Sequence, residues 1–279
     1  MKTRRSRLIL IASLAFGAGL SAQTLTGYGV VKNHYVTQTS SSAPVDDLFS
    51  PYGLSSYVFG TGLTGTYSFT SPAGSSAIPN PQTLTISGNQ AQFSSNTATA
   101  YPTTTALNAA YNDGVFSMVL PNMNGIPQMA ILPSFAGNLY PTTPQITSGT
   151  WSGGVLLVDP TQNYTLNFAA FASPTVNDSI GLGILGIGSF FPSTTATSFF
   201  ISAGTLTAGV TYEVSLRFNH NFIDYGVAIL GANGNSGFTT ENYFLIQAIP
   251  EPPTYAAILL GAVALAGVMI RRRRIAIVS

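Results

Sequence analysis

The feature that most restricts the fold of this chain is a period-two alternation of apolar and polar residues that recurs between turn residues. Residues 83–86 (TLTI) alternate, residues 87–89 (SGN) supply a turn, and residues 90–93 (QAQF) alternate again, which predicts a hairpin. Successive side chains of a strand point to opposite faces, so each such segment can bury one face and keep the other in water. The alternation therefore predicts a chain built mainly of strands.

Further strands are expected from the same pattern at 28–37, 57–69, 115–120, 128–132, 154–158, 164–171, 198–202, 212–218, 227–231 and 243–248. One short helix is expected at 104–112, and surface loops at 38–51, 71–81 and 141–148. Many short strands separated by Gly, Pro and Asn predict one all-β domain over residues 23–249, a β-sandwich or jelly roll. A β-helix is the alternative, although no fixed-period repeat is present.

Charge is concentrated at the two ends of the chain. Of the ten Lys and Arg residues, four precede residue 8 and four lie at 271–274, which leaves Lys32 and Arg217 between residues 23 and 249. Eight of the nine acids lie in that stretch, so its net charge is −6. Two cations cannot neutralise a phosphate backbone, which excludes nucleic-acid binding. The absence of Cys excludes disulfides, zinc-thiolate sites and cysteine nucleophiles.

The first 22 residues have the parts of a secretory signal peptide. Residues 2–7 are rich in Lys and Arg, residues 8–18 are apolar, and residues 19–22 (GLSA) supply the small residues of a cleavage site. The apolar run is too short to span a bilayer comfortably. The paired Arg4 and Arg5 also suggest a twin-arginine signal, but Arg7 stands where such signals usually carry an apolar residue. We expect export by the general secretory machinery and cleavage after Ala22.

A second membrane signal lies at the C-terminus. Residues 255–270 (YAAILLGAVALAGVMI) carry no charge and would form a helix about 24 Å long. Arg271, Arg272, Arg273 and Arg274 follow as a stop-transfer block on the cytoplasmic side. Both ends therefore predict one topology, with the body outside the membrane and these arginines inside.

A proline motif, Pro250-Glu251-Pro252, precedes the apolar span. The motif, the span and the arginine cluster, in this order at the extreme C-terminus, resemble the PEP-CTERM sorting domain of Gram-negative bacteria that make extracellular polysaccharide. The resemblance covers residues 250–279. Pro253 departs from it, because Ser is frequent at that place, and residues 275–279 extend the tail past the arginines.

The resemblance implies recognition by a membrane-embedded exosortase, which cuts near the motif and then transfers or releases the protein. Proline fixes φ and lacks a backbone donor, so residues 250–253 should present an extended segment to such an enzyme. We expect a protein that is first held in the membrane by its C-terminal helix and later lies at the cell surface or in the extracellular matrix. A permanent single-pass anchor without processing is the alternative.

The densest group of reactive side chains is Glu213, Arg217, His220 and Asp224. Glu213 and Arg217 share one face of an expected strand, and His220 and Asp224 follow in an expected loop. Solvated or structural roles explain these residues more simply than catalysis does. We identify no catalytic constellation and expect no enzyme.

Calcium suits an exported domain of this composition, because it needs only oxygen ligands. The candidate ligands share a place in expected loops: Asp46, Asp47, Asp113, Asp159, Asn177 and Asp178. No EF-hand loop or RTX nonapeptide accompanies them, and Asx turns explain them equally well. We therefore expect no metal site and no cofactor.

Two functions fit these observations. The first is a structural or adhesive protein of an exopolysaccharide or biofilm matrix, sorted by exosortase. The second is a carbohydrate-binding module or glycan-active enzyme that uses the same route. The single Trp, Trp151, is expected in the core. An exposed strip of aromatic side chains or a buried carboxylate pair would favour the second function, whereas aromatics confined to the core and isolated acids would favour the first.

Overall fold

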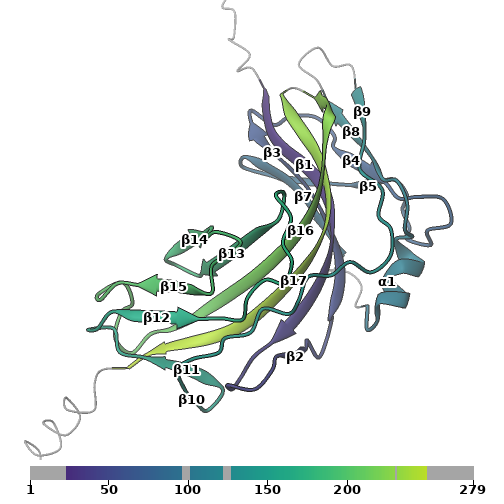
Figure 1. The fold of residues 1–279 in the computed structure, drawn as a ribbon. Helices are drawn as coiled ribbons and strands as arrows, with labels where there is room; N and C mark the ends of the chain where they lie inside the picture. The colour runs from purple at the N-terminus through teal and green to yellow at the C-terminus, as the bar shows by residue number, and fades with distance from the viewer. Residues whose placement is uncertain (1–22, 96–100, 122–126, 230, 250–279) are drawn as a thin grey trace, which may run out of the picture.

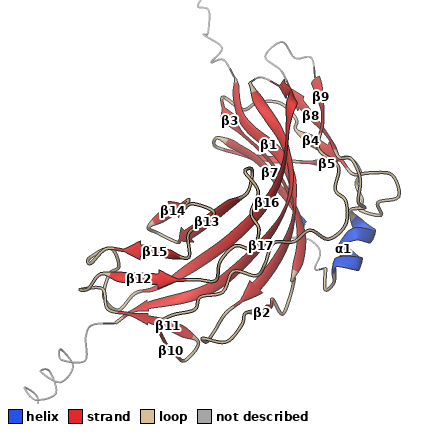
Figure 2. Cartoon of the chain, in the orientation of Figure 1, coloured by secondary structure: helices blue, strands red, loops and turns tan. Residues whose placement is uncertain are grey.

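The computed structural model describes residues 23–95, 101–121, 127–229 and 231–249, and of residues 224–228 only the backbone. These residues form three sheets and one short helix (Figures 1 and 2). The prediction of an all-β, sandwich-like fold is confirmed, and the β-helix alternative is not what the described strands form. The expected signal peptide and the expected sorting tail lie outside the described residues.

The largest sheet has eleven strands. Its main path is β14–β13–β16–β17–β1–β3–β7–β6, while β2 pairs with β1, and β11 pairs with both β10 and β17. In chain order these strands are β1 (Thr24–Thr37), β2 (Val45–Asp46), β3 (Tyr52–Thr61), β6 (Thr85–Ser87), β7 (Gln90–Ser94), β10 (Thr150–Ser152), β11 (Val155–Val158), β13 (Ser179–Ile184), β14 (Gly188–Phe190), β16 (Thr211–Ile229) and β17 (Ala232–Ala248).

Two smaller sheets and the helix complete the fold. One sheet has the order β5–β4–β8–β9 and the other pairs β12 with β15. Their bounds are β4 (Ser68–Thr70), β5 (Gln82–Thr83), β8 (Ser117–Pro121), β9 (Pro127–Ile131), β12 (Tyr164–Asn167) and β15 (Ser198–Ile201). Helix α1 (Thr104–Ala110) begins after Thr103, whose hydroxyl caps it by accepting a hydrogen bond from the Ala106 amide.

A long hairpin of β16 and β17 runs through the whole molecule (Figure 1). On its other edge, β17 pairs in parallel first with β1, from Gly234 to Tyr243, and then with β11, from Leu245 to Ala248. The strands β1 and β11 therefore lie end to end along one strand. This arrangement makes β17 the element that joins the two ends of the molecule.

Gln38 fills the junction where β1 ends. Its side-chain oxygen accepts hydrogen bonds from the Ile146 amide (2.8 Å) and from Asn242 Nδ2 (2.9 Å), and its Nε2 donates to the Ile146 carbonyl (2.8 Å). The side chain pairs with Ile146 as a peptide group of a strand would. The prediction of a surface loop beginning at Gln38 is wrong at this residue, which is 2% exposed.

One face of the main sheet carries both hydrophobic cores. Even-numbered residues of β1, β16 and β17 point to this face, as the buried side chains Val30, Phe218 and Phe238 illustrate. The four-stranded sheet and α1 contribute to the first core, and β12 and β15 contribute to the second. The odd-numbered residues of the same strands lie on the opposite face.

Most expected strands and the helix are found within a few residues of their predicted bounds, and the hairpin at 83–93 is the pair β6–β7. The single strand expected at 57–69 is wrong, because Gly62 and Gly65 adopt positive φ values of 65° and 87° and end the ladder between β3 and β4. The strand expected at 212–218 and residues 227–229 of the one expected at 227–231 lie in a single strand, β16. Strand β13 was not expected, since its sequence SIGLGI is rich in glycine.

No helix in the described part of the chain is long and apolar enough to cross a membrane. The apolar stretch 255–270, where a spanning helix is expected, lies outside the described residues.

Candidate functional site

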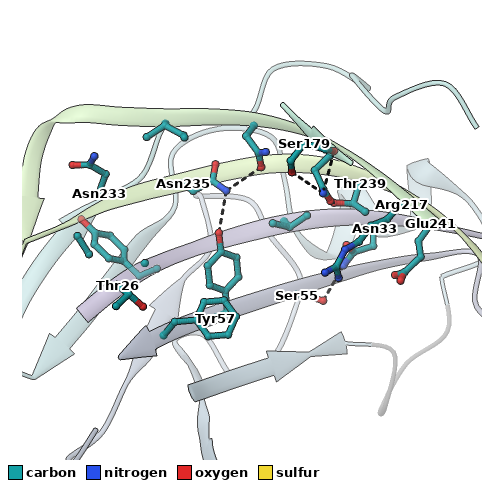
Figure 3. A pocket seen from close by; sticks show the side chains of 18 of the residues that line it. Thr26, Asn33, Ser55, Tyr57, Ser179, Arg217, Asn233, Asn235, Thr239 and Glu241 are labelled. Carbon is teal, nitrogen blue, oxygen red and sulfur yellow. Dashed lines mark hydrogen bonds between the residues drawn. The ribbon is translucent and has the colours of Figure 1, made fainter. Parts of the chain in front are cut away.

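The face of the main sheet opposite the cores contains a cavity of about 660 Å³ (Figure 3). Strands β1, β3, β13, β16 and β17 all contribute side chains to it. Because side chains alternate along a strand, these are mostly the odd-numbered residues that the cores do not use. We call this cavity the groove.

Carboxamide side chains from neighbouring strands form a hydrogen-bonded floor in the groove. Asn235 Nδ2 donates to the Tyr57 hydroxyl (3.0 Å) and to Asn221 Oδ1 (3.1 Å). Further along, Asn219 accepts from the Thr239 hydroxyl (2.8 Å) and donates to the Ser179 hydroxyl (3.0 Å). These bonds fix the orientation of the amide groups, so the groove presents an ordered set of donors and acceptors.

At two positions beside the groove, a glycine allows close contact between neighbouring strands. A Cβ atom at Gly29 would collide with the backbone oxygen of Asn235, and a Cβ atom at Gly181 would lie 2.5 Å from Arg217 Nε. The Arg217 side chain therefore rests directly on the backbone of β13. A side chain at Gly29 would therefore push β17 away, and one at Gly181 would displace the Arg217 side chain.

Aromatic rings occur along the groove and beside it. The rings of Tyr57 and Phe59 lie 5.0 Å apart at one end, and those of Tyr35 and Tyr243 lie 6.1 Å apart at the other. Phe59 is 43% exposed and Tyr243 is 41% exposed. These rings therefore form two separate pairs at the two ends of the groove, each with one exposed ring, and not one continuous exposed strip.

One pair of opposite charges stands beside these rings. Arg217 and Glu241 are directly opposite each other in the β16–β17 ladder and both line the groove. Burial, together with the negative charge of Glu241, raises the pKa of Tyr35 to about 12. The same two causes raise the pKa of Tyr243, so both phenols remain neutral donors at physiological pH.

The open face continues beyond the groove. Two smaller hollows of about 590 and 290 Å³ both border Glu213 and Tyr243. From Asn235 to Leu245 the face extends for roughly 33 Å along β17, at about 3.3 Å per residue. This length and the open shape suit an extended ligand better than a small molecule.

The structure separates the four reactive residues that the sequence brought together. Glu213 and Arg217 lie on the open face, as predicted, and alternate with the buried Val214 and Leu216. His220 points to the core face, and the expected loop around it is wrong, because β16 continues through this segment. The side chain of Asp224 lies outside the described residues.

His220 has a different carboxylate partner, Asp178, with Nδ1 2.9 Å from Oδ2. Burial opposes ionisation of this carboxyl group, but hydrogen bonds from the Thr175 amide, His220 and the Asn221 amide outweigh it, so the net effect lowers the pKa of Asp178. The pair connects the loop before β13 to β16. It has a structural role and does not line the groove.

The candidate calcium ligands are distributed over separate places. Asp46 contacts His34, Asp113 contacts Lys32, and Asp178 contacts His220. Asp47 and Asp159 accept hydrogen bonds from backbone amides two residues ahead, as in Asx turns. Among the described residues no group of three or more metal-binding side chains occurs.

Trp151 packs half-buried against the second core, with its ring 6.2 Å from that of Phe244, in agreement with the expected core position. The sorting residues Pro250, Glu251 and Pro252, the cleavage residue Ala22 and the arginines 271–274 lie outside the described residues. The domain closes immediately before the motif, where the Ile249 amide donates to the Val158 carbonyl (2.9 Å).

Sequence reasoning did not identify the amide residues of the groove. A signal was present, because Asn recurs two residues apart at 219 and 221 and again at 233 and 235. That spacing places each pair on one face of a strand. Asn and Gly are typical of turns, however, so these segments were not predicted as strands.

No protein-family model and no curated protein matches the sequence. Among solved structures, the chain is similar to fibronectin(III)-like modules of Clostridium thermocellum CbhA, with 10% identity, a TM-score of 0.21 and coverage of 81% of this chain and 95% of that one. It is also similar to a Ca²⁺-stabilized adhesin that helps an Antarctic bacterium reach out and bind ice, with 12% identity, a TM-score of 0.24 and coverage of 81% of this chain and 50% of that one. The all-β assignment rests on the described strands and not on these alignments.

Proposed function

We propose that this chain is an exported surface or matrix protein whose open sheet face binds extracellular polysaccharide. The observation that carries the proposal is the groove, in which hydrogen-bonded amides lie between two pairs of aromatic rings. Aromatic rings offer a flat apolar surface to the C–H faces of a sugar, and fixed amides match its hydroxyl groups. A face of this kind supports binding more directly than a purely structural role.

The charge of the domain favours neutral or weakly charged polysaccharide. Residues 23–249 carry a net charge of −6, and the groove contains one cation, Arg217, opposite one anion, Glu241. A strongly acidic polymer would be repelled by the domain at low ionic strength. The open ends of the face allow a long chain to pass across it.

Binding can be tested by affinity electrophoresis of the purified protein in gels that contain dextran, hydroxyethyl cellulose or alginate. We expect retardation by at least one of the two neutral polymers. Replacing Tyr57 and Phe59 together by Ala should weaken that retardation at least tenfold. Phe200→Ala is the matched control, because Phe200 is 55% exposed on β15 and does not line the groove.

The proposal would be refuted by a double variant that folds, as judged by circular dichroism, and still binds as the wild type does. Equal weakening by Phe200→Ala would show that the retardation reflects general surface hydrophobicity. Migration that is unaffected by all three polymers would leave the structural matrix role as the better supported function.

We also propose that exosortase processing delivers the domain to the surface or matrix. The motif begins one residue after the last described backbone hydrogen bond, so a cut there would leave the described domain intact. C-terminal peptide mapping of protein recovered from membranes and from matrix tests this proposal. A C-terminus at residues 250–254 in the matrix supports it, whereas an intact tail through Ser279, found only in membranes, contradicts it and supports a permanent anchor.

A further inference from the structure

A single lysine is buried in the first core. Lys32, on β1, has a fully inaccessible side chain and lies between Phe238 of β17 and Leu54 of β3 in the sheet. Its ammonium nitrogen stands 5.3 Å from the centre of the Phe135 ring. A buried lysine is costly for a fold, and the groove makes no use of this one.

Two polar groups meet the buried nitrogen. Lys32 Nζ lies 2.7 Å from Asn108 Oδ1, in helix α1, and 2.6 Å from Asp113 Oδ1, just after that helix. The other oxygen of Asp113 accepts a hydrogen bond from the Gly137 amide (3.2 Å), and Asn108 Nδ2 donates to Asn138 Oδ1 (3.3 Å). An amine, a carboxamide and a carboxylate are thus held together at the edge of an apolar, aromatic core.

We propose that Lys32 and Asn108 form an intramolecular isopeptide bond in the folded protein, with Asp113 as the group that carries protons between them. The lysine nitrogen needs to move only from the amide oxygen to the carbonyl carbon, which is one bond away. Holding reacting groups within van der Waals distance replaces a slow bimolecular encounter by an intramolecular step.

The chemistry balances without any external reagent. The Lys32 ammonium gives a proton to the Asp113 carboxylate, and the freed lone pair attacks the Asn108 carbonyl carbon. Protonated Asp113 then gives its proton to the amide nitrogen as the carbon–nitrogen bond of Asn108 breaks, and the carboxylate takes a proton from the attacking nitrogen. The products are a Lys–Asn amide and ammonia, which departs as ammonium after Asp113 ionises again.

The surroundings favour this reaction over a simple ion pair. Burial lowers the pKa of Lys32, although Asp113 opposes this effect, so the neutral amine is more accessible than at a solvated lysine. The departing nitrogen of Asn108 faces Asn138, which is exposed, so ammonia has a route to solvent. An ionised carboxylate is a poor electrophile, and this assigns the acyl role to Asn108 rather than to Asp113.

The sequence makes the test direct, because Lys32 is the only lysine after residue 22. Trypsin acting on the denatured, exported protein should cut after Arg217 but not after an acylated Lys32. Mass spectrometry should then show one uncut peptide that ends at Arg217, contains both residue 32 and residue 108, and is lighter by one ammonia than its sequence. Cleavage after Arg217 serves as the internal control for digestion.

Cleavage between Lys32 and Asn33, with an intact mass that shows no loss of ammonia, would overturn the proposal. A loss of one water mapped to Asp113 would overturn it as well. These outcomes are read on the wild-type protein and do not depend on the folding of any variant.

Two variants separate the roles of the residues. Asp113→Asn keeps the amine and the amide but removes the proton carrier, so Lys32 should become cleavable in that protein after denaturation. Asp47→Asn is the matched control and should keep the cross-link, because it makes the same change at a carboxylate that accepts hydrogen bonds from the Phe49 and Ser50 amides, away from Lys32. An Asp113→Asn protein that still carries the full cross-link would refute the role of Asp113.

Discussion

Gln38 supports the junction between the two halves of the sheet, and its removal should cost more than that of any exposed glutamine. In Gln38→Ala, the amide and carbonyl of Ile146 and Nδ2 of Asn242 lose their partner, and both residues are fully buried. Each unsatisfied buried polar group costs about 1–3 kcal/mol. With partial rescue by water in the space left behind, we expect a loss of roughly 3–6 kcal/mol in the free energy of unfolding.

Urea unfolding followed by the fluorescence of Trp151 measures this loss, because that single Trp packs against the second core. Gln145→Ala is the matched control, since Gln145 makes one exposed hydrogen bond, to the Ser41 carbonyl, and its loss should cost less than about 1 kcal/mol. A decrease below about 1.5 kcal/mol for Gln38→Ala would refute the reasoning, because water would then replace the side chain at little cost.

Three further predictions follow from the site and its surroundings. The folded state holds the pKa of Asp178 below its ordinary value, so the ionised Asp178 stabilises the fold fully above about pH 4, and this stabilisation is lost as the pH falls through the folded pKa. Acid unfolding of Asp178→Asn should lack this part of the pH dependence. Gly181→Ala should displace the Arg217 side chain, alter polysaccharide binding and leave the urea midpoint within the range of a surface change, as gel retardation and urea unfolding will show. Because the pKa of Tyr35 is raised to about 12, its contribution to stability should be complete below about pH 10 and be lost as the pH rises toward 12, a loss that Tyr35→Phe removes in alkaline unfolding.

Local alternation was sufficient to predict most of the strands. Residues 211–218 of β16 and residues 164–167 of β12 alternate between apolar and polar side chains, and the hairpin β6–β7 has its turn in the sequence. Alternation failed where an open face is built from turn-forming residues. The segment 232–242 (ANGNSGFTTEN) is rich in Asn and Gly, yet it is a strand, because β16 and β1 satisfy its backbone on both sides.

In the candidate site as well, local sequence patterns predicted some features and missed others. The sequence identified Arg217 and Glu213 as neighbours on one face of a strand, since two residues of spacing are enough for that inference. It did not place Arg217 opposite Glu241, or Asn235 beside Tyr57, because these pairs depend on the register between strands far apart in the chain. His220 was assigned to the wrong group for the same reason, as its partner Asp178 precedes it by 42 residues.

The sequence by itself determined the all-β class of this protein, the alternation of its strands and the distribution of its charges, because these depend on the residues and their near neighbours. Only the tertiary structure decided which face of the sheet stays open, which amides and aromatic rings meet in the groove, and that Lys32, Asn108 and Asp113 share one buried place. The physical reason is that β17 pairs with β16, β1 and β11, so long-range hydrogen bonds set the register that local patterns leave undetermined.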